Sequence, residues 1–169
     1  MTFLQRIARL RVSLGFIASV VAIWLARPTA RTLAAGAAVA LGGEAIRVWA
    51  AGHLEKGSEV TTSGPYAFTR HPLYLGSTLI GIGLAIAASS WLVTVLVAAY
   101  LGLTLTAAIR TEEAHLTAKF GPVYPDYRDG LGAGEPRHFN LARAMRNREY
   151  RAVTGLAIVL VVLLWKARA

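Results

Sequence analysis

The chain has 169 residues, of which 55% are hydrophobic and only 16% are charged. This composition excludes an ordinary soluble domain, in which about a quarter of the residues are charged, and the length allows one domain, residues 1–169. Lys and Arg outnumber Asp and Glu by 18 to 9 and there is no cysteine, which favours the inner face of a membrane over nucleic acid as a partner and excludes disulfides and thiol nucleophiles.

Five apolar runs predict an all-α, polytopic membrane protein, with transmembrane helices at residues 12–26, 33–51, 73–88, 91–109 and 152–165. The first run follows a basic start and also resembles a secretory signal peptide, but because four more runs follow it we interpret it as a retained helix. Ser89-Ser90 lies near the middle of a long uncharged stretch and is the predicted turn of a helical hairpin.

The second run contains Glu44 and Arg47, which share one helix face and can pair. Either this pair neutralises itself, or Arg47 is kept for the negative charge of a substrate, the reading that we favour. In the third run, Gly76, Gly81 and Gly83 permit close helix packing. Gly81-x-Gly83 also allows the backbone to approach a ligand.

The distribution of Lys and Arg predicts the orientation. The amino-terminal end, residues 53–71 and the basic segment 110–151 together carry 13 Lys and Arg, against 4 on the other side. The positive-inside rule then places the amino end in the cytoplasm, with the chain in the cytoplasmic (inner) membrane. Within the basic segment, residues 141–150 are predicted to form a helix on the membrane surface.

The two polar segments richest in chemistry therefore share the cytoplasmic face. In the first, Pro72 is expected to begin a helix, with His71 at its cap, Arg70 beside it and free N–H groups on Leu73 and Tyr74. Such a helix start is suited to an anionic group, although a positively charged interface anchor has the same composition.

The second segment contains Glu112 and Glu113. Glu112-x-x-His115 has the spacing of a di-iron ligand pair but lacks a second copy, so we predict no metal site. A cofactor of mixed charge fits better: Arg70 and His71 would meet its carboxylate, and Glu112 or Glu113 its amine or ribose hydroxyls. Aromatic rings that can line a base or a sulfonium are those of Tyr66, Tyr74, Tyr124 and Tyr127.

From Gly42 to Arg128 the order of these motifs resembles the isoprenylcysteine carboxyl methyltransferase family, which is related to the phospholipid N-methyltransferases. The motifs are Gly64-Pro65-Tyr66, Arg70-His71-Pro72-x-Tyr74-x-Gly76, Glu112-Glu113-x-x-Leu116 and Phe120-Gly121-x-x-Tyr124-x-x-Tyr127. The resemblance implies a cytoplasmic pocket for S-adenosylmethionine and a lipid acceptor. Because five spans replace the eight of the eukaryotic enzymes, a prenylcysteine substrate does not follow.

The resemblance maps His71, Tyr74, Gly76, Glu112 and Glu113 to the cofactor site, and Gly81-x-Gly83 to a glycine pair of the phospholipid branch. With the residues argued from chemistry, the predicted cofactor set is Tyr66, Arg70, His71, Tyr74, Leu75, Gly76, Gly81, Gly83, Glu112, Glu113, Tyr124 and Tyr127. Methyl transfer needs alignment and exclusion of water. The predicted catalytic residues are Arg110 or Arg47, which would hold a carboxylate acceptor, and Glu112, as the base for an amine acceptor.

The leading hypothesis is methyl transfer from S-adenosylmethionine to a lipidic or small hydrophobic acceptor. An alternative enzyme is an NADPH-dependent reductase of the sterol-reductase type, in which Arg128, Arg137 and Arg143 would bind the 2′-phosphate. The non-enzymatic alternative is a membrane scaffold whose basic helix binds anionic lipid. The sequence leaves the oligomeric state and the acceptor open.

Overall fold

The computed structural model describes residues 3–130 and 137–168, and within these ranges all regular secondary structure is helical. The elements are α1 (Phe3–Leu25), α2 (Ala30–His53), the 3-10 helix η1 (Gly64–Ala67), α3 (Pro72–Ala88), α4 (Trp91–Phe120), α5 (Val123–Arg128), α6 (Leu141–Arg146) and α7 (Tyr150–Lys166). The predicted all-α class is confirmed. Residues 131–136 of the predicted basic segment lie outside the described residues.

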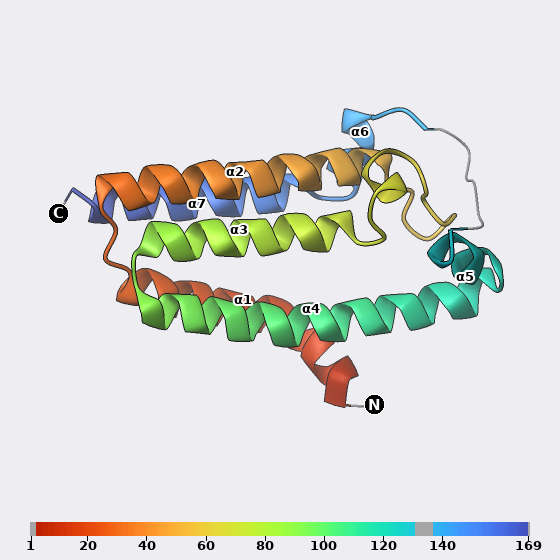
Figure 1. Cartoon of the computed structure of the whole chain (residues 1–169), viewed down its shortest axis with the longest axis horizontal. Helices are drawn as coiled ribbons and strands as arrows, with labels where there is room; N and C mark the ends of the chain where they lie inside the picture. The colour runs from red at the N-terminus through yellow and green to blue at the C-terminus, as the bar shows by residue number, and fades with distance from the viewer. Residues whose placement is uncertain (1–2, 131–136, 169) are drawn as a thin grey trace.

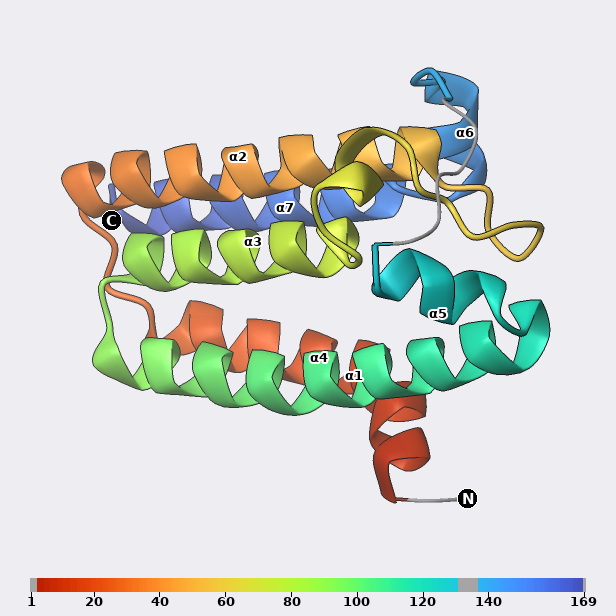
Figure 2. The same cartoon turned by 45° about the vertical axis from the view of Figure 1, so that its right-hand side comes forward.

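The long helices run side by side in two groups (Figure 1). One group holds α2, α3 and α7, the other holds α1 and α4, and α3 contacts α4 between them (Figure 2). The α2–α3 connection, α5 and α6 gather at one end of the bundle, whereas the carboxyl end of α7 lies at the other (Figure 1). The polar segments around residues 53–71 and 110–130 therefore share one end, as the sequence predicts.

Two of the described helices, α2 and α4, are long and apolar enough to cross a membrane. Only 28% and 22% of their most apolar windows are buried inside the protein, so most of this apolar surface faces outward. Shorter apolar helices cover Ser13–Leu25 and Pro72–Ala88. The number of five membrane-spanning helices remains a prediction, and α2 and α4 are the two helices that support it most directly.

Several helices extend beyond the apolar runs that predicted them. Helix α4 continues past Ile109 to Phe120, because the polar residues that follow the apolar run, such as Glu and Lys, also favour a helix. It ends before Gly121, whose φ is 55°. Helix α1 likewise begins at Phe3 rather than at residue 12. The predicted hairpin turn is present at Ser89, which ends α3 with φ 49°.

The predicted surface helix over residues 141–150 is wrong in extent. Helix α6 ends at Arg146, and α7 begins at Tyr150. Two features break the helix between them. Arg148 has a φ of 61°, and the side chain of Asn147 donates to the carbonyls of Ala51 and Leu54 at the end of α2. The turn is therefore fixed by tertiary contacts that helical periodicity cannot show.

Paired glycines bring α2 and α3 into close contact. Gly36 and Gly43 of α2 face Gly83 and Gly76 of α3. A Cβ added to Gly83 would lie 2.5 Å from the Gly36 carbonyl oxygen and from the Ala40 nitrogen. On each helix the two glycines are seven residues apart along the chain, which is about two helical turns. The predicted packing role of small residues is confirmed for Gly76 and Gly83.

Replacing Gly83 with alanine is expected to destabilise the fold, by about 1–3 kcal/mol, because backbone rather than a flexible side chain blocks the new methyl group. Gly42→Ala is the matched control, since a Cβ at Gly42 meets nothing within 4 Å. Thermal unfolding in detergent measures both. Equal melting temperatures for the two variants would contradict the close packing of α2 on α3.

Candidate functional site

The start of α3 has the local structure that the sequence predicts. Pro72 is the first helical residue, and His71 is its cap residue, with no hydrogen bond from its side chain to the helix. The imidazole is therefore available to other groups. One detail differs from the prediction: the N–H of Tyr74 donates to the His71 carbonyl oxygen at 3.0 Å, so it is not free.

Glu113 of α4 is the centre of a network that joins α3, α4 and α5. Its Oε1 lies 3.0 Å from His71 Nε2 and 3.9 Å from Arg70 Nη1, and it accepts the Tyr124 hydroxyl at 3.3 Å. The hydrogen bond from His71 is the largest of the effects that hold the pKa of Glu113 below its usual value. The carboxylate is therefore ionised at neutral pH.

Glu112 has different partners from its neighbour. It is exposed, and its Oε2 accepts the Tyr74 hydroxyl at 2.6 Å. The Tyr74 ring also packs beside the His71 ring, with 5.6 Å between centroids. Adjacent residues on a helix point about 100° apart, which explains why the two glutamates reach two different side chains at the start of α3.

The tyrosines complete one side of this cluster. The Tyr127 hydroxyl donates to the Tyr66 carbonyl oxygen at 2.6 Å, which ties α5 to η1. The Tyr124 and Tyr127 rings lie 6.3 Å apart. Burial raises the pKa of the Tyr66 and Tyr127 hydroxyls, and that of Tyr124 to about 12. All three hydroxyls are therefore neutral hydrogen-bond donors at neutral pH.

We call this group the α3-start cluster. Its members are Tyr66, Arg70, His71, Tyr74, Glu112, Glu113, Tyr124 and Tyr127, all of which belong to the predicted cofactor set. They come from segments that lie up to 61 residues apart along the chain. The structure thus brings together the two polar segments that the sequence singles out.

Other predicted cofactor residues lie elsewhere. Gly76 and Gly83 face α2, whereas a Cβ at Gly81 would meet the Leu101 side chain of α4. Helix packing accounts for these glycines, and their role in cofactor binding stays a prediction. Leu75 is exposed, on the first turn of α3.

The two predicted catalytic arginines have different surroundings. Arg110 is exposed, on the same helix as Glu113. Arg47 is largely buried, and its Nε lies 2.7 Å from Glu149 Oε1 and 3.9 Å from Glu44 Oε2. Because its guanidinium is already paired, the arrangement gives no support to the predicted contact of Arg47 with a substrate. Neither carboxylate oxygen of Glu44 has a hydrogen-bond partner among the described residues.

Sequence reasoning missed Glu149. It stands among four arginines at positions 143, 146, 148 and 151, and nothing in its spacing links it to Arg47. The only signal was its position just before the last apolar run, where a buried acidic residue needs a basic partner.

A second charged cluster fixes α6 to the end of α2. Glu55 lies 2.7 Å from Arg143, 3.2 Å from Arg146 and 3.4 Å from Arg137, while Arg137 also pairs with Glu59. The hydrogen bond from Arg143 is the main effect that lowers the pKa of Glu55. Each of these three arginines therefore has a carboxylate partner within the protein, although two carboxylates serve three guanidinium groups.

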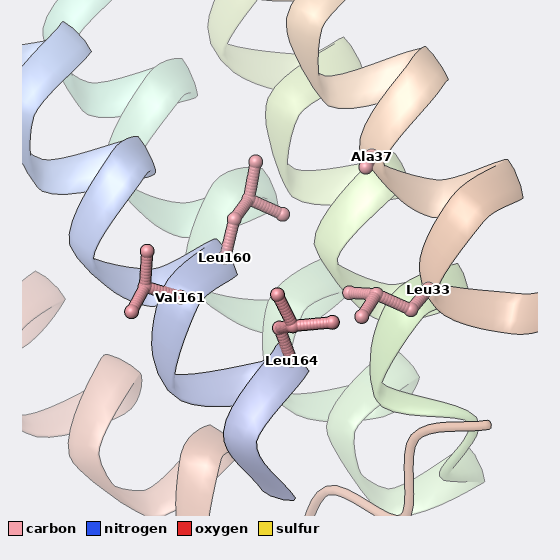
Figure 3. A pocket seen from close by; sticks show the side chains of 5 residues that line it. All are labelled: Leu33, Ala37, Leu160, Val161 and Leu164. Atoms are coloured by element: carbon pink, nitrogen blue, oxygen red, sulfur yellow. The ribbon is translucent and has the colours of Figure 1, made fainter. Parts of the chain in front are cut away.

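A hollow between α2 and α7 lies near the opposite end of both helices from the α3-start cluster. Figure 3 shows its lining residues, which are Leu33, Ala37, Leu160, Val161 and Leu164. It contains no polar side chain, so it carries no catalytic chemistry.

Within residues 3–130 and 137–168 no group of three or more acidic, histidine or cysteine side chains could hold a metal ion. The absence of a metal site stays a prediction.

Over the described residues the fold is helical, two of its helices are long and apolar enough to cross a membrane, and a charged cluster lies at one end of the bundle; these are features of the class of helical membrane proteins. More particularly, the chain belongs to the phospholipid methyltransferase family, whose model matches residues 10–123. The predicted resemblance is confirmed, and the family points to a methyltransferase in a membrane. Helices α6 and α7 lie outside the matched region.

Individual relatives match over shorter stretches. The chain is 37% identical over 93 residues to the cobalt-zinc-cadmium resistance protein of Cupriavidus metallidurans, covering 54% of this chain and 43% of that protein. It is 34% identical over 77 residues to the protein-S-isoprenylcysteine O-methyltransferase of Schizosaccharomyces pombe, covering 46% and 33%. The match therefore spans less than half the length of these curated relatives. No solved structure matches.

Proposed function

We propose that this protein transfers a methyl group from S-adenosylmethionine to a lipidic or small hydrophobic acceptor at the cytoplasmic face of the membrane. The observation that carries the proposal is the convergence of Arg70 and His71 at the start of α3 with Glu112 and Glu113 of α4. Membership of the phospholipid methyltransferase family supports it independently.

The charges of the α3-start cluster fit this cofactor. S-adenosylmethionine carries a carboxylate, an ammonium group and a sulfonium. Arg70 and His71 are donors for the carboxylate, and Glu112 or Glu113 accepts from the ammonium group or the ribose hydroxyls. The rings of Tyr66, Tyr74, Tyr124 and Tyr127 offer π-faces to the adenine or to the sulfonium. When bound, the cofactor supplies an activated methyl group.

Within the cluster, the two glutamates are assigned different tasks. Glu113 is held by His71, Arg70 and Tyr124, so it keeps the cluster in shape and contributes to binding. Glu112 is exposed and is the candidate base that takes the proton of an amine acceptor. The bound cofactor would supply the methyl group for an in-line displacement, and the part of this chain would be to align the acceptor and exclude water. Arg110 would hold a carboxylate acceptor instead.

The reductase alternative has less support, because each of the three arginines that it assigns to the 2′-phosphate has a carboxylate partner in the protein. Arg137 and Arg143 are paired with Glu55, and Arg128 is paired with Asp129. Calorimetric titration of the full chain in detergent with S-adenosylmethionine and with NADPH tests the choice. Binding of S-adenosylmethionine alone is expected. Binding of NADPH alone would favour the reductase, and binding of neither would favour the scaffold.

The proposed orientation makes a separate prediction. With five spans and the amino end in the cytoplasm, a reporter fused after Trp165 should be active only outside the cytoplasm. The excess of basic residues at the end of the bundle that holds the α3-start cluster is the physical reason. Paired fusions of alkaline phosphatase and a fluorescent protein measure it; a fusion after Thr62 is the matched control, expected to report the cytoplasm. Cytoplasmic activity after Trp165 would contradict the orientation or the number of spans.

A further inference from the structure

A buried ion pair links the start of α7 to α2. Glu149, the residue before α7, accepts from Arg47 Nε at 2.7 Å, and the side chains are 8% and 19% exposed. Charged groups at such burial are kept in place by their partners, because breaking one side leaves the other uncompensated. Glu149 therefore fixes where the Arg47 guanidinium lies.

The other end of this guanidinium contacts the first turn of α3. Arg47 Nη1 donates to Ser77 Oγ at 2.5 Å and to the Leu73 carbonyl oxygen at 3.3 Å, and Ser77 Oγ itself donates to that carbonyl at 2.8 Å. Gly76 leaves room for the arginine stem, since an added Cβ would lie 2.5 Å from Arg47 Cγ. Leu73 stands next to Tyr74 and two residues after His71, so Arg47 holds the turn that carries both.

Electrostatics also connects Glu149 with the cluster. The pKa of Tyr66 is raised mainly by burial, with further contributions from the charge of Glu112 and, more weakly, from that of Glu149. Both carboxylates thus act on the same hydroxyl, in agreement with the contacts of Arg47 with the first turn of α3.

From these contacts we propose that Glu149 is a positioning residue for the α3-start cluster, acting through Arg47 on the first turn of α3. The ligand in this proposal, S-adenosylmethionine, comes from the proposed function. Glu149 itself lies outside residues 10–123, the part of the chain that the family model matches. It gives the last helix a part in shaping the site as well as in packing.

The experiment compares Glu149→Gln with Lys166→Met in the full chain, purified in detergent. Lys166 is the matched control because it also anchors α7, through bonds of 2.8 Å to the carbonyls of Ile23 and Trp24 at the far end of the helix. Both variants should melt earlier. Only Glu149→Gln should weaken S-adenosylmethionine binding, by about five- to thirtyfold, and speed amide hydrogen exchange at residues 73–78.

Ser77→Ala provides a second variant that leaves the α7 contact untouched. It removes one of the two groups of α3 that accept from Arg47 and leaves the Leu73 carbonyl, so two- to tenfold weaker binding is expected with little change in melting temperature. Equal losses of binding for Glu149→Gln and Lys166→Met, or unchanged exchange at residues 73–78, would overturn the proposal. If the unmodified protein binds no S-adenosylmethionine, the proposed function fails, and the exchange measurement alone decides whether Glu149 orders the α3 start.

Discussion

Replacing His71 with alanine is expected to weaken S-adenosylmethionine binding by about ten- to a hundredfold. A hydrogen bond to a charged group contributes about 1.5–3 kcal/mol, and 1.4 kcal/mol corresponds to a factor of ten. His71 would make such a bond to the cofactor carboxylate, and it also holds Glu113, 3.0 Å away. Isothermal titration of the purified variant measures the loss.

The same variant should fold and insert normally, because the His71 side chain makes no capping bond to α3 and Pro72 still sets the helix start. His115→Ala is the matched control, since His115 is exposed on α4, two residues after Glu113. It is expected to bind like the unmodified protein. Normal binding by His71→Ala combined with a much lower melting temperature would show that His71 serves the fold and that the site lies elsewhere.

The two glutamates are expected to respond unequally to replacement by glutamine. Glu113→Gln should weaken cofactor binding by roughly ten- to a hundredfold, because it removes the carboxylate that holds His71 in place and that would accept from the ammonium group or the ribose hydroxyls. Glu112→Gln should weaken binding only a few-fold, since Glu112 is exposed and accepts a single hydroxyl from Tyr74. If the acceptor is an amine, Glu112→Gln should instead slow turnover.

Titration and single-turnover methyl transfer on both variants separate the two effects. Tyr124→Phe helps to interpret them, because it removes the hydroxyl that donates to Glu113 and keeps the ring. A loss of a few-fold is expected for it. Small and equal losses for Glu112→Gln and Glu113→Gln would mean that the pair is a solvated acidic face, and the assigned roles would then be wrong.

The meeting of Arg70 and His71 with Glu112 and Glu113 is predictable from sequence because two general rules suffice. Apolar run lengths set how often the chain reverses, and basic residues set which turns share a side. Pro72 adds the local signal for where α3 begins. All of these rules depend only on the order of residues along the chain, so they also predict the helical class and the turn at Ser89.

Contacts between helices depend on how each helix is rotated, and hydropathy does not encode that rotation in helices that are apolar on most sides. The sequence therefore predicted an Arg47 turned toward a substrate, whereas the structure pairs it with Glu149, 102 residues away. The same reason applies to Gly81 and Gly83, which look like one motif but face α4 and α2. Helix ends set by tertiary contacts, as at Asn147, are hidden in the same way.

The most direct test of the central claim is to follow a labelled methyl group. Membranes that contain the protein would be incubated with S-adenosylmethionine carrying a radioactive methyl group, and the label in the lipid extract would be counted against membranes with His71→Ala. We expect label in a lipid or small hydrophobic product, and a reduction of at least tenfold in the variant at sub-saturating cofactor. Absence of label above membranes that lack the protein, together with no binding of S-adenosylmethionine to the purified chain, would contradict the proposed methyl transfer.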